Sequence, residues 1–155
     1  MSEKKGVLFV CLGNICRSPI AEAVFSHVLK QRGLEEKWFT DSAATGNWHS
    51  GHRPDSRALT VLRRHGVHTD HRARQICDED FDRFEYIFGM DGNNIDDIND
   101  EKPRGSKCVV ELLGKYDPQK QTIIKDPYYG SGDKGFETNY EQCLRCCNAF
   151  LDQFQ

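Results

Sequence analysis

The chain has 155 residues and a net charge of −3, so we expect one domain over residues 1–155 and no basic surface for a nucleic-acid partner. It contains neither a run of about 18 apolar residues that could span a membrane nor, at Met1–Lys5, the start of a signal peptide, so no membrane span is expected. Seven cysteines, an odd number without a secretory context, favour free thiols in a reducing compartment and a cytoplasmic location.

Predicted strands and helices alternate along the chain. Apolar runs predict strands over Gly6–Val10, Trp38–Ala44, Tyr86–Met90 and Cys108–Leu112. Helical spacing and capping residues predict helices from Ser18 to about Gly33, over Asp55–His65, after Asp78, over Asn93–Asn99, and from Phe136 to the last apolar residue, Phe154. This order predicts an α/β fold with a parallel sheet and helices on both faces. Ligands bind such folds beyond the carboxyl ends of the strands, where Cys11 and Asp91 follow the first and third strands.

The segment between the first strand and the first helix is the most informative in the chain. It reads Cys11-Leu12-Gly13-Asn14-Ile15-Cys16-Arg17-Ser18. A loop that enters a helix N-terminus presents unpaired N–H groups and the positive end of the helix dipole, which together bind anions. A thiol in that field ionises readily, and a guanidinium offers forked donors that suit phosphate oxygens. The pattern therefore predicts that Cys11 is a thiolate nucleophile aimed at a phosphate held by residues 12–17.

A second segment, Cys77 to Arg83, has the same spacing, so the spacing alone is not specific. This segment has no glycine and four acidic residues, which would repel a phosphate. We interpret it as the solvated acidic start of a helix with Asp78 as its N-cap. Only the first segment has a preceding strand and the pair Gly13 and Asn14, residue types that tolerate a left-handed backbone.

Separated motifs in this chain resemble those of the low-molecular-weight protein tyrosine phosphatases. Besides the loop, the resemblance covers Asp41-Ser42-Ala43-Ala44-Thr45, Asp126-Pro127-Tyr128-Tyr129-Gly130, Tyr116–Gln121 and the Cys143-x-x-Cys146-Cys147 tail. It implies a four-stranded parallel sheet with the phosphate-binding loop after the first strand. It also implies hydrolysis of phosphotyrosine and other aryl phosphate monoesters without a metal or other cofactor. Phosphotyrosine-containing proteins and small aryl phosphates would be substrates, and phosphate-like anions would be inhibitors.

The resemblance also implies a role for each matching residue. Cys11 would form a cysteinyl-phosphate, Arg17 would hold the phosphate oxygens and Asp126 would protonate the leaving phenolate. Ser18 is placed to donate a hydrogen bond to the sulfur. The supporting residues would be Asn14, Ser42 and His71, in a network that braces the loop, and Asp91 on the arginine side of the site.

Aromatic side chains are expected to form the pocket wall, because they fit a flat phenyl ring and exclude water. The wall residues are Leu12, Trp48, Tyr128 and Tyr129. Within the wall, Asn47–His49 is a candidate for tuning substrate choice. Cys16 lies in the same curled loop as the nucleophile, so we expect it to form a disulfide with Cys11 after peroxide has oxidised the thiolate. The cluster Cys143, Cys146 and Cys147 lacks an evident fourth ligand, and no metal site is expected there.

Other classes of function share parts of this pattern. An arsenate reductase on the same fold also starts from a loop cysteine, but it relays oxidation through further cysteines near the third strand, and residues 84–99 contain none. A non-catalytic phosphate-binding module needs no nucleophile and no acid, whereas this chain has Cys11, Arg17 and Asp126. A flavodoxin-like binder would not need the pairing of cysteine and arginine.

Overall fold

The computed structural model describes residues 4–154, so parts of the predicted domain 1–155 and of the segment Met1–Lys5 lie outside the described residues. Its parallel sheet has the order β2-β1-β3-β4. The strands are β1 (Lys5–Cys11), β2 (Trp38–Ala44), β3 (Tyr86–Gly89) and β4 (Val109–Leu112). The helices are α1 (Arg17–Arg32), α2 (Ser56–Arg64), α3 (Asp80–Arg83), α4 (Gly92–Glu101), the 3-10 helix η1 (Leu113–Tyr116) and α5 (Lys134–Asp152). Within residues 4–154 no helix is long and apolar enough to cross a membrane.

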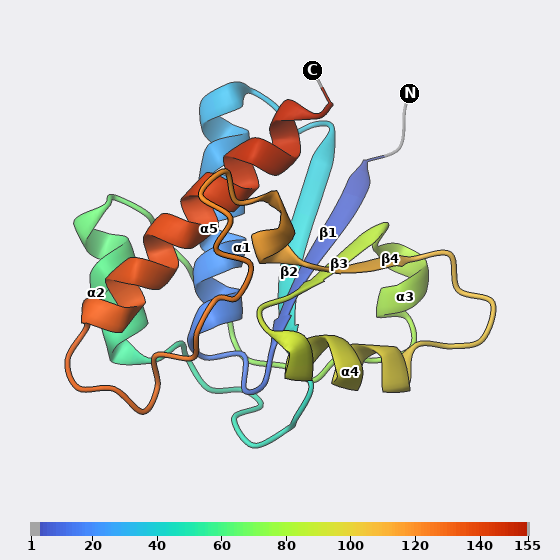
Figure 1. The fold of residues 1–155 in the computed structure, drawn as a ribbon, viewed down its shortest axis with the longest axis horizontal. Coiled ribbons are helices and arrows are strands. Elements are labelled where there is room, and N and C mark those ends of the chain that lie inside the picture. Colours follow the sequence, from blue (N-terminus) through green and yellow to red (C-terminus); the bar gives the residue numbers. More distant parts are fainter. Residues whose placement is uncertain (1–3, 155) are drawn as a thin grey trace.

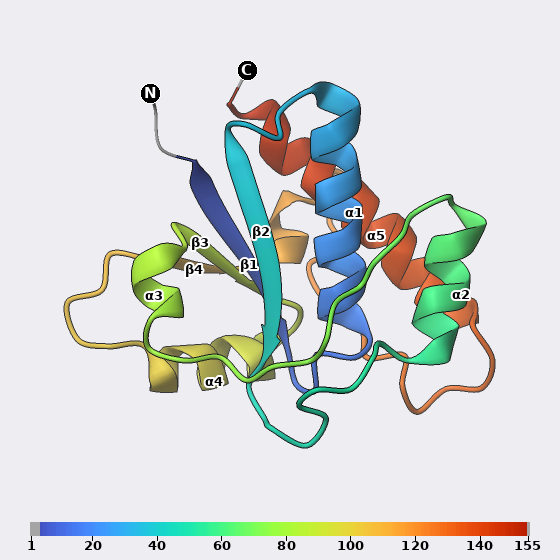
Figure 2. The same cartoon turned by 180° about the vertical axis from the view of Figure 1, so that it is seen from behind.

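Helices cover both faces of the sheet, which confirms the predicted architecture. Helices α1 and α5 pack together on one face, and α2 lies beside α5, while α3 and α4 lie on the other side (Figures 1 and 2). Strand β1 lies between β2 and β3, and its side chains alternate between two cores. Val7 and Phe9 pack into the larger core with α1 and α5, and Leu8 and Val10 pack into the smaller core with α3 and α4. Both faces of β1 are therefore buried, as is typical of parallel strands.

Most predicted element boundaries lie within two residues of the observed ones. The strand Trp38–Ala44 is confirmed, and α1 ends at Gly33, whose φ of 69° is the left-handed conformation that glycine adopts without strain. Asp55 is the N-cap of α2 rather than its first residue. The 3-10 helix η1 is not predicted from the sequence, and α5 begins at Lys134, inside the irregular stretch that we expect to run to Phe136.

The first helix begins one residue before its predicted start at Ser18. Helix α1 begins at Arg17, with Cys16 as its N-cap, so Ser18 and Pro19 lie within its first turn. The hydroxyl of Ser18 does not cap the helix but lies 2.9 Å from the sulfur of Cys11. A serine at a helix start usually caps it, and here the same side chain is used in the site instead.

The predicted start of the third helix is wrong. Glu79, and not Asp78, is the N-cap of α3, and its side chain makes no capping hydrogen bond. Asp80 is buried rather than solvated, because its two carboxylate oxygens accept hydrogen bonds from Arg74 at 2.9 and 3.0 Å. A further bond from the backbone N–H of Cys77 to Asp80 closes the turn. A buried carboxylate needs such partners, so the local acidic pattern misleads here.

Candidate active site

The candidate site lies at the carboxyl edge of the sheet, which is the lower edge in Figure 1. Cys11 is the last residue of β1, and Asp91, just after β3, is the N-cap of α4. Adjacent parallel strands bring these two residues to the same edge. The predicted position of the site is therefore the one at which the structure brings its residues together.

The sulfur of Cys11 receives hydrogen bonds from two directions. It accepts one from the backbone N–H of Asn14 at 3.2 Å, and it lies 2.9 Å from Oγ of Ser18. Asn14 has a φ of 57°, a left-handed conformation that asparagine tolerates, and this conformation accompanies the inward N–H. Ser18 accepts a hydrogen bond from Asn14, so its own hydrogen is free to point at the sulfur. These donors lie at the N-terminus of α1, where the helix dipole makes the loop suited to an anion.

The side chain of Asn14 is the centre of a buried network. Its Nδ2 donates to Oγ of Ser18 at 2.8 Å and to Oγ of Ser42 at 3.0 Å. Its Oδ1 lies 2.7 Å from Nε2 of His71 and accepts the backbone N–H of Arg74 at 3.1 Å. Asn14, Ser18 and Ser42 are fully buried, so water does not compete for these bonds. The structure thus joins Ser42 and His71 to the loop, as the sequence predicts.

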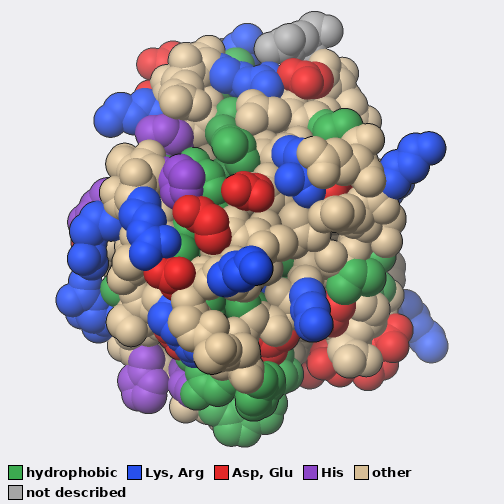
Figure 3. Space-filling model, turned by 60° about the vertical axis from the view of Figure 1, so that its left-hand side comes forward, with side chains coloured by type: hydrophobic (Ala, Val, Ile, Leu, Met, Phe, Trp, Pro, Cys, Tyr) green, Lys and Arg blue, Asp and Glu red, His purple; other side chains and the backbone are tan. Residues whose placement is uncertain are grey.

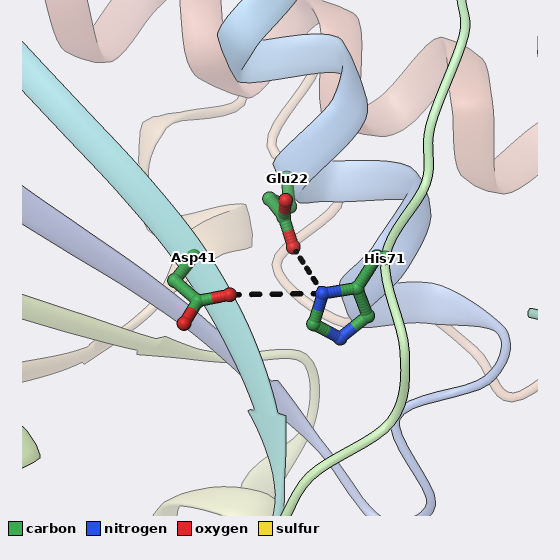
Figure 4. Close-up of side chains that lie close together, drawn as sticks. All are labelled: Glu22, Asp41 and His71. Carbon is green, nitrogen blue, oxygen red and sulfur yellow. Dashed lines mark ion pairs between the residues drawn. The ribbon is translucent and has the colours of Figure 1, made fainter. Parts of the chain in front are cut away.

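A charged cluster of Glu22, Asp41 and His71 lies behind this network (Figure 4). Nδ1 of His71 is 3.1 Å from Glu22 and 3.6 Å from Asp41, and Oγ of Ser42 donates to Glu22 at 2.6 Å. Burial raises the pKa of Glu22 to about 7 and lowers the pKa of His71. The three groups have the spacing of metal ligands, but each ligand atom already lies in an ion pair or hydrogen bond.

Sequence reasoning does not find Glu22, although one signal for it exists. Glu22 lies four residues after Ser18 on α1, and residues at that spacing share a helix face. Once Ser18 is placed beside the sulfur, the next residue on that face of the helix also points at the loop network. The carboxylate then supplies the acceptor that the Ser42 hydroxyl needs.

Arg17 is 2% exposed and is fixed by two hydrogen-bond acceptors and a nearby carboxylate. Its Nη1 donates to Oδ2 of Asp91 at 2.7 Å and to the carbonyl of Ile124 at 3.0 Å, and its Nη2 lies 3.8 Å from Asp126. Asp91 is fixed in turn, because it also caps α4 by accepting the N–H of Asn94 at 2.9 Å. The guanidinium therefore has one orientation, and it lines the cavity above the loop.

A cavity of about 300 Å³ opens above the loop. Its lining includes the predicted catalytic residues and the four predicted wall residues, namely Cys11, Arg17, Asp126, Leu12, Trp48, Tyr128 and Tyr129. The predicted phosphate-binding residues Gly13, Ile15 and Cys16 also line it, together with His49, whereas Asn14 is buried beneath the loop. Trp48 and Tyr129 are 65% and 84% exposed, so the mouth is open to solvent. Figure 3 shows hydrophobic side chains gathered at this lower end of the molecule, with histidines beside them.

Asp126 reaches this cavity from the long irregular segment between η1 and α5. Its Oδ1 accepts the backbone N–H of Tyr128 at 3.0 Å, and its Oδ2 faces Arg17. The side chain is 30% exposed, so it is in contact with both the cavity and solvent. Pro127, the next residue, restricts the backbone on the side of the carboxylate.

The place of Trp48 at the mouth depends on Gly46. A Cβ atom at Gly46 would lie 2.0 Å from the indole ring, far inside van der Waals contact. Only glycine lets the ring fold back over the chain at this point. The wall of the cavity is therefore set partly by a residue that never touches its contents.

Comparison with known proteins places this geometry in context. A family model described as low molecular weight phosphotyrosine protein phosphatase matches residues 6–155. A protein of that name from Sus scrofa is 54% identical over 151 residues, which are 96% of this chain and 95% of that protein. The crystal structure of Primo-1 is 46% identical, with a TM-score of 0.93 over 97% of this chain and 99% of that one. DARP, a Drosophila arginine phosphatase, is 38% identical, with a TM-score of 0.90 over 96% and 97% of the two chains.

We predict that Gly46→Ala weakens binding of an aryl anion without weakening that of inorganic phosphate. The added methyl group displaces the ring of Trp48, and one aromatic contact is worth about 0.5–1.5 kcal/mol, or about 2- to 10-fold in affinity. Calorimetric titration with benzylphosphonate and with phosphate measures both effects. Trp48→Ala is the reference variant. Adding Gly46→Ala to it should not weaken benzylphosphonate binding further. Equal weakening of both ligands would show that the substitution disturbs the loop itself.

Proposed function

Because the chain belongs to the low molecular weight phosphotyrosine protein phosphatase family, we propose that it hydrolyses phosphotyrosine through a cysteinyl-phosphate on Cys11. The family consists of hydrolases that use no metal ion. One observation carries the assignment of residues. The sulfur of Cys11, the guanidinium of Arg17 and the carboxylate of Asp126 line one cavity, although they come from distant parts of the sequence. These are the nucleophile, anion-binding group and acid that such a reaction needs.

In the proposed mechanism two displacements occur at phosphorus. The thiolate of Cys11 attacks, an S–P bond forms, and the P–O bond to the phenol breaks as Asp126 donates a proton to the leaving oxygen. Asp126 then accepts a proton from water, which attacks phosphorus, and the S–P bond breaks to release phosphate and the thiolate. Arg17 and the loop N–H groups hold the three equatorial oxygens through both steps.

Four residues support this proposal without taking part in bond making. Ser18 stabilises the thiolate, and Ser42 and His71 hold Asn14, so that its N–H points at the sulfur. Asp91 orients the guanidinium of Arg17. All four act within one phosphatase domain, which we propose to comprise residues 1–155.

The pocket wall favours aromatic phosphates. Leu12, Trp48, Tyr128 and Tyr129 flank the path to the loop, and a flat ring fits between such side chains. A phosphoserine is too short to carry its phosphate to the bottom of this pocket. Small aryl phosphates enter in the same way, and phosphate-like anions compete for the loop. The nearest alternative, arsenate reduction, finds no support, since the relatives compared above are named phosphatases.

The chemistry also favours a reducing compartment. A cysteine nucleophile must be kept as a free thiol, and all seven cysteines are free. We therefore propose that the protein works in the cytoplasm. Outside the loop, Cys108, Cys143, Cys146 and Cys147 are buried, which protects them from modification.

Hydrolysis of p-nitrophenyl phosphate in the presence of EDTA tests the proposed function. The wild-type protein should be active, since no metal takes part. Cys11→Ser should be inactive, because the same field does not ionise a serine hydroxyl, and Arg17→Lys should also fail, because an ammonium cannot replace a forked donor. Activity above a few per cent in either variant would contradict these roles.

The role of Asp126 predicts an effect that depends on the leaving group. Asp126→Ala should lower kcat/KM by about 10²–10⁴-fold for phenols that leave poorly and by less for phenols that leave unaided. An equal loss across the series of phenols would mean that Asp126 is structural.

Reversible oxidation is proposed for Cys11 and Cys16. Both thiols line the cavity. Burial raises the pKa of Cys16 far above its ordinary value, so Cys16 stays a thiol and peroxide reacts first with the Cys11 thiolate. Peroxide converts that thiolate to a sulfenic acid. Cys16 then loses its proton and attacks the oxidised sulfur, which forms the disulfide and releases water.

We predict that Cys16→Ser keeps its activity but recovers poorly after peroxide treatment. Dithiothreitol should restore the wild-type protein, and bound phosphate should protect it from oxidation. Mass spectrometry of the oxidised wild-type protein checks for the Cys11–Cys16 disulfide. Full recovery of the variant, without that disulfide in the wild type, would exclude a resolving role.

A further inference from the structure

The start of α2 connects the phosphate loop with the segment that carries Asp126. The backbone N–H of Asp55 donates to the carbonyl of Ile15, in the phosphate loop, at 2.8 Å. The carboxylate of Asp55 accepts hydrogen bonds from the backbone N–H, Nε and Nη2 of Arg57 at 2.9, 3.0 and 3.0 Å. Asp55 thus caps α2, orients the Arg57 side chain and is itself attached to the loop.

Arg57 extends this connection to the other side of the cavity. Its Nη1 donates to the carbonyl of Gly130 and its Nη2 to the carbonyl of Tyr128, both at 3.1 Å. The guanidinium carbon lies 4.6 Å from the ring centre of Phe136 and 5.7 Å from that of Tyr128. One planar cation therefore binds Asp55 with one edge and two loop carbonyls with its remaining donors.

The carbonyls that Arg57 binds flank the peptide that fixes the acid. The N–H of Tyr128 donates to Oδ1 of Asp126, so this residue contacts the acid through its N–H and Arg57 through its carbonyl. The segment around them has no regular secondary structure and contains Gly132 with a φ of 67°. Within residues 126–132 the hydrogen bonds that the structure describes are the one from Tyr128 to Asp126 and a turn from Gly130 N–H to the carbonyl of Pro127. Before Asp126 the chain is anchored by bonds from Ile124 N–H to the carbonyl of Met90 and from Asn139 to the carbonyl of Lys125. After Asp126, at Tyr128 and Gly130, the anchor is Arg57.

We propose that Arg57, oriented by Asp55, is a positioning residue that holds Asp126 over the phosphate loop. The proposal rests on the role of Asp126 given above. Although burial opposes it, hydrogen bonds from Arg57 lower the pKa of Asp55, so the pair stays ionised over the working pH range. Arg64 also reaches this segment through Asp133, but that pair is exposed and contributes little.

The test compares kcat/KM across aryl phosphates of different leaving groups for Arg57→Met and the wild-type protein. Methionine keeps the apolar stem against Phe136 and removes every donor. Misplacing the acid by about 1 Å should lower kcat/KM about 10- to 100-fold for phenols that leave poorly, and much less for good leaving groups. Inhibition by inorganic phosphate should stay within about twofold, since the bond from Asp55 to Ile15 is between backbone atoms.

Arg63→Met is the matched control. Arg63 lies on the same helix and is exposed, and its side chain makes no hydrogen bond or ion pair within the described part of the chain. It should behave as wild type. Arg57→Lys should recover only part of the loss, because one ammonium cannot bind a carboxylate and two carbonyls together. Thermal unfolding of each variant checks that the fold is kept.

A double-variant cycle separates positioning from general stability. In an Asp126→Ala background, Arg57→Met should cause no further loss, because no acid remains to be positioned. The proposal would be overturned if the losses of kcat/KM in the two single variants multiplied in the double variant. It would also be overturned if Arg57→Met had the same kcat/KM as Arg63→Met. If the loss of kcat/KM in Asp126→Ala is the same for good and poor leaving groups, Asp126 is not the acid. That result would overturn the role of the acid and the positioning role with it.

Discussion

The site depends on one buried amide, the side chain of Asn14. A loop that points its N–H groups at a substrate cannot use them to hold itself, so its shape must be fixed from outside. Asn14 does this with its side-chain amide and its backbone N–H. Nδ2 donates to two hydroxyls, Oδ1 contacts His71 and Arg74, and the backbone N–H donates to the sulfur. Because the residue is fully buried, loss of any partner leaves a polar group without water to replace it.

Two different scaffolds position the reacting groups. Cys11, Arg17 and Asp91 lie at the ends of strands or the start of a helix, where packing of the sheet fixes the backbone. Asp126 lies on an irregular segment, and its carboxylate is fixed by the backbone N–H of Tyr128 and by the nearby guanidinium of Arg17. Regular structure thus holds the nucleophile and the anion-binding group, while hydrogen bonds from α2 hold the acid. Contacts outside the cavity therefore have a larger part in positioning the acid than in positioning the nucleophile.

Sequence patterns predicted the sheet, its helices and the residues that line the cavity, because these depend on local periodicity and on motifs. They did not predict partners that only folding brings together. Arg57 and Gly130 are 73 residues apart, and nothing local to either residue indicates the contact. The buried pair of Arg74 and Asp80 is only six residues apart, but the acidic run around Asp80 resembles a solvated helix start. The contact of Ser18 with the sulfur was predicted, because both residues belong to the same loop motif.

The burial of β1 on both faces has a consequence for how the molecule opens. Local unfolding begins where few apolar contacts hold the chain and reaches a doubly buried central strand last. The mostly exposed segment from Asp126 to Asp133 therefore detaches at a lower free energy than β1, which carries Cys11. The first partly open state keeps its phosphate cradle and nucleophile but has no proton donor. Tyr128 and Tyr129 leave with the segment, so this state also loses part of the pocket wall. Mild heating should therefore abolish hydrolysis while the phosphate loop is still folded.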